Sequence, residues 1–346
     1  MTIKIPETLS GQRLKPDIFI TGLKNPRGIL TPDDHTMLII EAGSGIPGKS
    51  DGRLIKVNLS DPEQEVHCLL DQQPSMNMQT MMLRDEILGL SDIATDGESI
   101  LASVTDYIQG SKLLRISPAP VTTLATIEGH LNSIVYHPAL QSWFGIKPDS
   151  NTLVEFLPDG TERTVHQLQA MPDGQDAVPV CIIYEEQSQS FLVTLFSGET
   201  GRHPGRRGID FEQRAGQVIR IQPETGECIP LVTGLTAPTG VALGDDDTLY
   251  VLELCSDYLE PLISEDSIDQ CLHGGFKRHS GRLLAISLAS GEVTVLAEQL
   301  DTPSNLKIHR QTVFVSAGMG IPGRPVPDAR GKPVALTGSI LRIPLD

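Results

Sequence analysis

Several features that would place the chain in a familiar functional class are missing from its 346 residues. No run of about 18 apolar residues is present, so no membrane-spanning segment is predicted. The opening Met1–Pro6 has no charged leader followed by an apolar core, so no export signal is expected. Basic residues are also few, because 27 Lys and Arg stand against 44 Asp and Glu, for a net charge of −17. Nucleic-acid binding depends on clustered Lys and Arg, so we expect no nucleic-acid partner, and the net charge favours a cationic or neutral ligand.

The motifs of common catalytic and metal-binding sites are missing as well. The five cysteines have no CxxC or Cys/His zinc spacing, which predicts free thiols in a reducing cytoplasm, although Cys255 and Cys271 flank one loop and would be able to pair in an exported protein. No Gly-x-Ser-x-Gly nucleophile motif and no P-loop occurs. Residues 318–323 have dinucleotide-loop spacing, but they contain a proline and reappear at residues 43–48, which predicts a repeated turn.

An internal repeat organises the chain, and its best copy is residues 234–254. There an apolar run ends at the turn residues 244–247, and alternating side chains follow from Thr248 to Leu252, which predicts a β-hairpin. Residues 22–41 repeat this pattern closely, and weaker copies begin at residues 89, 130, 178 and 300. The six starts lie roughly 40 to 65 residues apart, the length of a four-stranded propeller blade. The sequence therefore predicts an all-β fold, a six-bladed β-propeller with four antiparallel strands per blade, as one domain over residues 1–346.

The two ends of the chain are predicted to share a blade. Residues 17–22 resemble the outermost strand of a blade, but no blade precedes them, while the last blade has no fourth strand after residues 338–344. We expect these two segments to pair, because that pairing closes the ring and removes open sheet edges.

Long connections are predicted to emerge on one face of the propeller. Four join second to third strands (residues 42–51, 197–215, 255–280 and 317–338), and two lead into the next blade (residues 71–87 and 167–177). Loops on a rigid frame commonly carry function, so a ligand is expected at this face.

Three of these connections have unusual compositions. Residues 71–86 hold four of the eight methionines, which predicts either a rim loop or short helix, or an adaptable apolar lid over a ligand. Residues 197–215 carry four arginines, Arg202, Arg206, Arg207 and Arg214, which either bridge acidic neighbours or form a cationic flap. Residues 255–280 have apolar residues at helical spacing, which predicts a short capping helix.

Polar side chains are predicted where strands reach the loop-bearing face. First strands begin there with Arg27, Asp92, Asn132, Thr239 and Asn305, and second strands end there with Glu41, Asp106, Lys147, Ser197, Glu253 and Ser316. Buried polar residues often only satisfy neighbouring backbone groups, and that interpretation stays open for each residue singly. As a catalytic set we predict Glu41 and Glu253 for proton transfer, Arg27 or Lys147 for stabilising negative charge, and Asp106 as a further carboxylate. Asp92, Asn132, Thr239, Asn305, Ser197 and Ser316 are the predicted substrate-binding residues. If Glu41, Asp92, Asp106 and Glu253 converge within one cavity, their mutual repulsion should raise the pKa of at least one of them, and Arg27 or Lys147 should lie close enough to offset the rest.

The repeats GLKNPRGILTPDDHTMLIIEAGSG and GLTAPTGVALGDDDTLYVLEL resemble the NHL-type six-bladed propellers. Within them the chain is similar to the scytonemin-cluster proteins of cyanobacteria, and more distantly to the SMP-30, gluconolactonase and strictosidine synthase propellers. The resemblance implies a role in small-molecule specialised metabolism. SMP-30-like lactonases bind a divalent metal through Glu, Asn and Asp at first-strand starts; Asn132 matches that Asn, but Arg27 occupies the Glu position, so no metal or other cofactor is favoured.

Three hypotheses for function follow. The first is a metal-independent enzyme that binds a small organic molecule and performs cyclisation, lyase or condensation chemistry. The second is a metal-assisted lactone hydrolase, in which Glu41, Asp92 or Asp106 would contribute to a different oxygen-ligand cluster. The third is a non-catalytic propeller that presents its rim to another protein.

Overall fold

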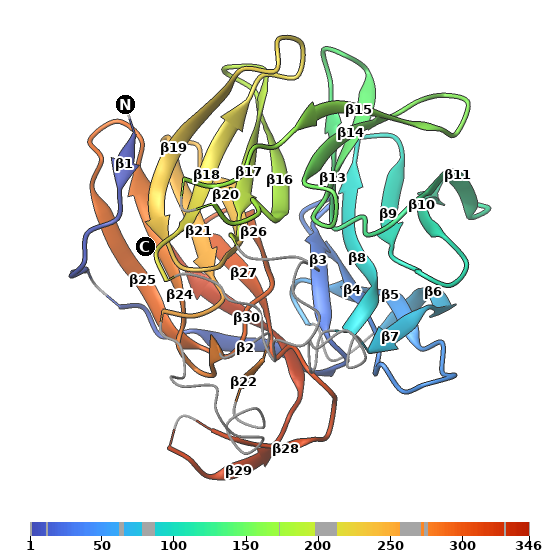
Figure 1. Ribbon diagram of the computed structural model, residues 1–346. Coiled ribbons are helices and arrows are strands. Elements are labelled where there is room, and N and C mark those ends of the chain that lie inside the picture. The colour runs from blue at the N-terminus through green and yellow to red at the C-terminus, as the bar shows by residue number, and fades with distance from the viewer. Residues whose placement is uncertain are drawn as a thin grey trace.

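The computed structural model describes residues 2–11, 13–61, 66–77, 87–172, 174–197, 213–256, 271–272, 276–328 and 330–345. These residues form six antiparallel sheets of four strands each, arranged in a ring, and two of the sheets carry one additional edge strand (Figure 1). The described residues contain no helix, and hence none that could span a membrane. The predicted all-β, six-bladed propeller is confirmed.

Each blade begins at the channel and ends at the outside of the ring. Blade 1 contains β3 (Pro26–Leu30), β4 (Thr36–Glu41), β5 (Gly52–Asn58) and β6 (His67–Gln73). Blade 2 contains β8 (Ile87–Thr95), β9 (Ile100–Val104), β10 (Ser111–Ser117) and β11 (Thr122–Ile127), with β7 (Ser75–Asn77) beside β8. Blade 3 contains β12 (Ser133–His137), β13 (Ser142–Lys147), β14 (Thr152–Phe156) and β15 (Glu162–Gln167).

The other three blades follow the same order. Blade 4 contains β16 (Pro179–Glu185), β17 (Ser190–Leu195), β18 (Gly216–Ile221) and β19 (Cys228–Leu235). Blade 5 contains β20 (Pro238–Leu243), β21 (Thr248–Glu253), β24 (Gly281–Ser287) and β25 (Val293–Leu300). Blade 6 contains β26 (Asn305–His309), β27 (Thr312–Ala317), β30 (Gly338–Pro344) and β2 (Asp17–Leu23). Successive first strands contact one another, and β26 contacts β3, so the six inner strands enclose the central channel.

The ring closes through the two ends of the chain, as predicted. β2 pairs antiparallel with β30, so Asp17 lies opposite Arg342 and Thr21 lies opposite Ser339. This pairing gives blade 6 its fourth strand and leaves no open edge between the first and last blades.

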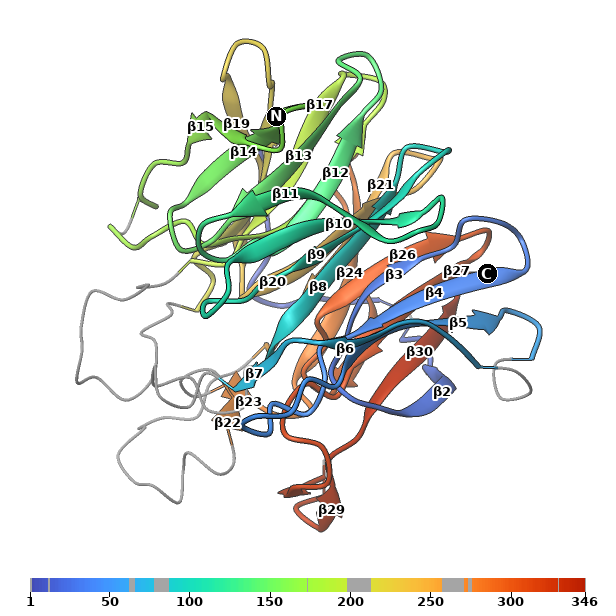
Figure 2. The same cartoon turned by 90° about the vertical axis from the view of Figure 1, so that its right-hand side faces the viewer.

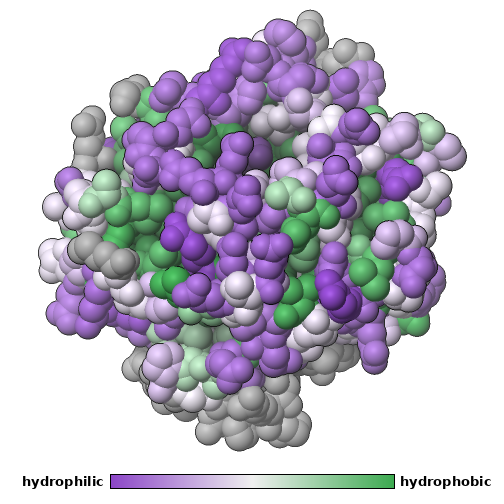
Figure 3. Space-filling view, turned by 90° about the horizontal axis from the view of Figure 1, so that it is seen from above, coloured by the Kyte–Doolittle hydropathy of each residue, from purple (hydrophilic) through white to green (hydrophobic). Residues whose placement is uncertain are grey.

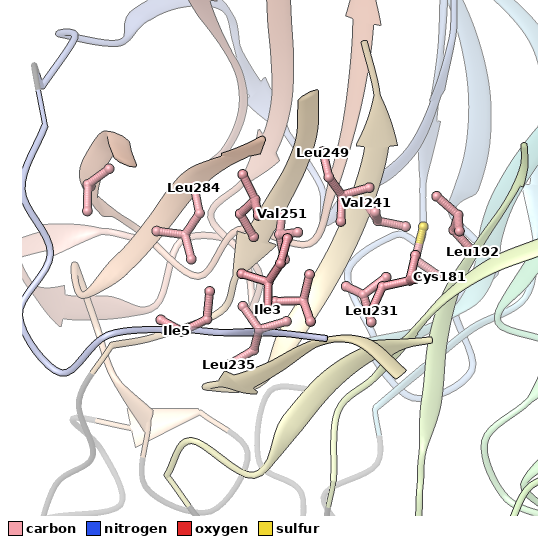
Figure 4. Close-up of a cluster of buried hydrophobic side chains, with 14 residues drawn as sticks. Ile3, Ile5, Cys181, Leu192, Leu231, Leu235, Val241, Leu249, Val251 and Leu284 are labelled. Carbon is pink, nitrogen blue, oxygen red and sulfur yellow. The ribbon is translucent and has the colours of Figure 1, made fainter. Parts of the chain in front are cut away.

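The segment before β2 crosses the outside of two further blades, which the sequence did not predict. β1 (Ile3–Lys4) pairs in parallel with β19 of blade 4, and the Leu14 amide donates to the Leu296 carbonyl of blade 5 at 2.6 Å. Ile3 and Ile5 insert into the apolar cluster between blades 4 and 5, where they meet side chains of both sheets (Figure 4). The N-terminal segment therefore links blades 4, 5 and 6.

Glycine and proline fix how closely neighbouring blades pack. The third strands of blades 4, 5 and 6 each begin with glycine, and a Cβ added there would lie within 2.5 Å of a proline Cδ at the next blade's first strand. The three pairs are Gly216 with Pro238, Gly281 with Pro303, and Gly338 with Pro26. Between neighbouring blades, alternate strand residues contribute to an apolar cluster that the two blades share.

One face of the ring carries the longer connections. The strands β7, β22 (Cys271–Leu272), β23 (Phe276–Lys277) and the pair β28 (Pro325–Pro327) and β29 (Pro333–Ala335) lie together on one side of the ring in Figure 2. We call this side the elaborated face. Residues 257–270 of the predicted capping helix, three of the four methionines in 71–86, and Arg202, Arg206 and Arg207 fall outside the described residues.

The outer surface is mainly polar where it is seen in Figure 3, which views the molecule from above relative to Figure 1. Apolar patches on that side are separated by hydrophilic side chains. Cys68, Cys181 and Cys228 are free thiols. The alternative pairing of Cys255 with Cys271 involves the Cys271 side chain, which lies outside the described residues.

Candidate functional site

Polar side chains at the starts of the first strands form a ring of hydrogen bonds around the channel mouth. In four of the six blades such a side chain donates to a backbone carbonyl at the first strand of the next blade. The bonds are Arg27 Nη2 to Ile87 O at 3.0 Å, Asn132 Nδ2 to Val180 O at 2.6 Å, Thr239 Oγ1 to Pro303 O at 3.1 Å, and Ser304 Oγ to Pro26 O at 2.9 Å. The structure thus brings the predicted Arg27, Asn132 and Thr239 to the mouth, and each also joins neighbouring blades.

Asp92 lies one residue deeper and joins three blades through its hydrogen bonds. Its Oδ2 accepts from the Ser133 hydroxyl at 2.5 Å and the Ile134 amide at 3.1 Å, and its Oδ1 accepts from Asn305 Nδ2 at 3.5 Å. Blade 1 contributes Gly28 at this level, where a Cβ would lie 2.8 Å from the Asp92 Cα. A side chain on blade 1 would therefore displace the carboxylate that blades 2, 3 and 6 share.

Two further titratable side chains, Lys307 on β26 and Cys181 on β16, interact electrostatically with Asp92. Burial raises the pKa of Asp92, against the opposing effects of its hydrogen bonds and of the Lys307 charge. Burial lowers the pKa of Lys307, and the Asp92 charge opposes that change. Burial, assisted by the Asp92 charge, raises the pKa of the Cys181 thiol to about 12. The channel centre therefore disfavours charge on all three groups.

Sequence reasoning missed Lys307, although a signal for it existed. In the other five blades, the position of the first strand that is equivalent to Lys307 holds an apolar residue. These residues are Leu30, Ala94, Val135, Ile183 and Ala242. A lysine at a position that is otherwise apolar places a cation beside the channel. Ser133 was missed because a serine at a strand start is common.

The two carboxylates predicted for proton transfer occupy equivalent buried positions. Glu41 and Glu253 have no exposed surface, and each forms an ion pair with an arginine on the third strand of its own blade, Arg53 or Arg282. Each also accepts a backbone amide hydrogen bond at 2.6 Å, from Lys24 or Thr236 respectively. The polar contacts described for them stay within their own blade and the loop that enters it, so the predicted convergence with Asp92 in one cavity is not observed.

The cause of the raised carboxylate pKa also differs from the one that we expected. The pKa of Glu253 is raised by burial, while Arg282 opposes the change. Repulsion between carboxylates, which we expected from the sequence, is not the cause. The cations near these carboxylates are Arg53 and Arg282, not Arg27 or Lys147.

The remaining strand-end residues are tied to local partners. Lys147 pairs with Glu162, and Asp106 Oδ1 accepts from the amides of Ile108 and Gln109 at 2.8 and 3.0 Å. Ser197 donates to Gln175 Oε1 at 2.9 Å, and Ser316 donates to Arg27 O at 2.6 Å. Among these four, the hydrogen bond of Ser316 is the one that reaches a channel-lining strand of another blade, β3.

Apolar residues gather over the mouth on the side of blades 4 to 6. The cluster contains Val178, Phe196, Ala237, Leu254, Cys255 and Met319, with the partly exposed Val180 packed against it. These residues flank the first strands or follow the second strands at the elaborated face. The cluster therefore joins the ends of blades 4, 5 and 6 at this face.

A pocket lies away from the channel mouth. It has a volume of about 340 Å³ and lies between blades 5 and 6. Its lining includes Glu298, Asp301 and Ser339, and the lining residues that the structure describes include none from a channel-lining first strand. Among the described residues, no group of three or more His, Cys, Asp and Glu side chains is arranged to hold a metal ion.

Neither a family model nor a curated protein matches the chain. Solved structures do match it across most of its length. A luciferin-regenerating enzyme aligns with a TM-score of 0.55 at 11% identity, covering 95% of each chain. Virginiamycin B lyase from Staphylococcus aureus, a catalytically inactive variant with quinupristin, aligns with a TM-score of 0.52 at 11% identity, covering 95% of this chain and 98% of the lyase. A chain of a nidogen/laminin complex aligns with a TM-score of 0.52 at 11% identity, over 82% of this chain and 86% of the other. At these identities the likeness shows a shared β-propeller fold.

Proposed function

We propose that the chain is an enzyme that binds a small organic molecule at the mouth of the channel and converts it by metal-independent acid–base chemistry. One observation carries the proposal: Asp92 and Lys307 lie on channel-lining strands of blades 2 and 6, interact electrostatically, and have pKa values displaced by burial toward their uncharged forms. Perturbed groups of this kind concentrate at functional sites.

The residues around the mouth have complementary roles in this proposal. A carboxyl group with a raised pKa holds its proton closer to neutral pH, so Asp92 is the group that gives and takes a proton. Arg27 stabilises negative charge that develops on the substrate, and Asn132 and Asn305 orient it. Glu41 and Glu253, our first choices from sequence, instead hold the mouth in shape through their ion pairs.

Two of the structural neighbours support an enzymatic role, because the fold of the luciferin-regenerating enzyme and of virginiamycin B lyase is shared by this chain. A cyclisation, lyase or condensation reaction suits a site that has one acid–base group and one cation. The resemblance to NHL-type propellers of the scytonemin-cluster kind supports specialised metabolism as the setting, and the free thiols of Cys68, Cys181 and Cys228 support the cytoplasm as the location.

A non-catalytic role is the second candidate, and the hydrogen-bond ring favours it. Arg27, Asn132 and Thr239 each donate to a neighbouring carbonyl, which a purely structural ring would also require. The nidogen/laminin neighbour shows that the same fold occurs in a protein complex.

The test combines ligand identification with a matched pair of variants. Molecules that co-purify with the protein are identified by mass spectrometry, and the protein is incubated with a metabolite extract to detect compounds consumed and formed. Asp92→Asn should lower the rate of conversion by about a hundredfold or more, because it removes the titrating proton. Asp61→Asn, at an exposed carboxylate, is the control and should have no effect. Equal conversion by a folded Asp92→Asn variant, or no conversion by any version, would favour the second candidate.

A further inference from the structure

A buried ion pair of blades 1 and 5 is replaced by two small residues in blade 6. In these three blades the third strand begins with glycine, and the residue after that glycine lies opposite the end of the second strand. The two facing residues are Glu41 and Arg53 in blade 1, Glu253 and Arg282 in blade 5, and Ala317 and Ser339 in blade 6. Blade 6 therefore lacks the long charged side chains that fill this position in the other two blades.

The pocket between blades 5 and 6 lies at this position. Ala317 and Ser339 both line it, together with residues 298–301 of the connection from blade 5 and with Lys15 and Pro16 of the N-terminal segment. Its volume of about 340 Å³ is in the range of sites that bind small molecules. The space that a glutamate occupies in blades 1 and 5 is thus part of a pocket in blade 6.

A backbone amide at the pocket has lost the acceptor that its counterparts have. Lys24 and Thr236 lie two residues before the first proline of blades 1 and 5, and their amides donate to Glu41 and Glu253 at 2.6 Å. The equivalent residue of blade 6 is Asp301, which lies two residues before Pro303 and lines the pocket. Within the part of the chain that the structure describes, no group accepts a hydrogen bond from the Asp301 amide. That donor is therefore left for water or for a ligand.

The charges around the pocket allow a ligand with a negative charge. The Asp301 carboxylate accepts from Arg278 Nε at 2.9 Å, and Glu298 forms an ion pair with Arg13 Nε at 2.8 Å. Both carboxylates that line the pocket are therefore balanced by arginines. Lys15 also lines the pocket, its side chain is exposed, and it forms no ion pair with another described residue. One positive charge is thus left over at the pocket.

We infer that this pocket binds a small organic carboxylic acid, whose carboxylate takes the place of the glutamate that blades 1 and 5 have there. The Asp301 amide, the Ser339 hydroxyl and the Lys15 ammonium are the donors to that carboxylate. Pro16 and Leu341, which are partly exposed, contact the carbon body of the acid. The site is separate from the channel mouth, so the inference does not depend on the proposed function.

Two probes of the same shape but different charge test the inference. The acid is 3-phenylpropionate, which has the atoms of a glutamate side chain joined to an apolar ring, and its neutral counterpart is 3-phenylpropionamide. Titrations of the full chain, followed by the NMR signals of each probe, give the dissociation constants. The amide should bind about tenfold more weakly than the acid, because it lacks the charge. Lys15→Met should weaken the acid about threefold or more and change the amide by less than about twofold, and Ser339→Ala should weaken the acid about threefold.

A rebuilt ion pair and a matched control complete the experiment. Ala317→Glu combined with Ser339→Arg restores the two side chains of blades 1 and 5, and it should abolish binding of both probes. Lys56→Met removes an exposed lysine on β5 of blade 1 and should leave both dissociation constants unchanged. The inference is wrong if the unaltered protein shows no saturable binding of the acid, if acid and amide bind equally, or if folded Lys15→Met binds the acid as before.

Discussion

Asp51 at the end of the loop of residues 42–51 offers a quantitative test of how the elaborated face is held. Its Oδ1 accepts from the Ser44 amide at 2.8 Å and the Ser44 hydroxyl at 3.0 Å, and its Oδ2 lies 3.0 Å from Lys24 Nζ and 3.5 Å from Lys49 Nζ. Burial alone would raise the pKa of Asp51, but these hydrogen bonds and charges lower it from 3.8 to about 2. The carboxylate is therefore stabilised in the folded protein.

The magnitude follows from the two pKa values. A difference of about 1.8 corresponds to about 2.5 kcal/mol of unfolding free energy at neutral pH, at about 1.4 kcal/mol for each factor of ten. Solvent screens the ion pairs, because the Lys24 and Lys49 side chains are 38% and 51% exposed, so we expect about 1 kcal/mol. Because the folded pKa is lowered, this contribution is complete above about pH 5 and is lost as the pH falls from about 4 toward 2.

Asp51→Asn keeps an oxygen for Ser44 and removes the charge. Denaturant unfolding of both proteins should show the variant less stable by about 1 kcal/mol at pH 7, with about half of that difference left at pH 3. The matched variant Asp61→Asn at an exposed site should show no such trend. A stability difference that stays constant between pH 7 and pH 3 would refute the electrostatic reasoning and indicate lost packing instead.

Two other predictions concern packing of the blades. Gly281→Ala places a Cβ 2.5 Å from Pro303 Cδ and should destabilise the protein by about 1 to 3 kcal/mol in denaturant unfolding. Gly244→Ala, whose added Cβ has its nearest neighbour at 3.1 Å, should destabilise it less. Equal effects would exclude the contact between Gly281 and Pro303 as the cause. Ile5→Ala leaves a cavity in the cluster between blades 4 and 5 and should lower the free energy of unfolding by about 2 to 4 kcal/mol. Ile18→Ala, at a side chain that is 66% exposed, should lower it by less than about 0.5 kcal/mol. An Ile5→Ala variant of unchanged stability would show that the N-terminal segment does not stabilise the ring.

The blades and their closure could be predicted because both depend on patterns that repeat along the chain. Hairpin turns and alternating residues mark each unit, and a missing outer strand at one end matches an unpaired segment at the other. β1 could not be predicted, because two residues form no periodic pattern. Its place is decided by the burial of Ile3 and Ile5 between two blades, which only the assembled ring creates.

The candidate site was less predictable, because position along a strand does not reveal the partner across it. Glu41 and Glu253 do end second strands as expected, yet Arg53 and Arg282 neutralise them. The signal was present in the repeat itself, since both copies begin their third strand with Gly-Arg. Asp92 and Asn305 could be predicted because polar residues were sought at the starts of the first strands. Lys307 could be recognised only by aligning the first strands of all six blades.

The pairing of β2 with β30 has a consequence for synthesis on the ribosome. β2 is translated before blades 1 to 5, but its partner β30, in which Arg342 lies opposite Asp17, is translated after them. Until then β2 presents unpaired backbone groups to other nascent chains, and the inner strands of blades 1 and 6 cannot yet meet. The ring is therefore completed only after residues 338–344 have emerged, and a ribosome that stalls within the last blade leaves an open arc whose β2 strand is free to pair with another polypeptide.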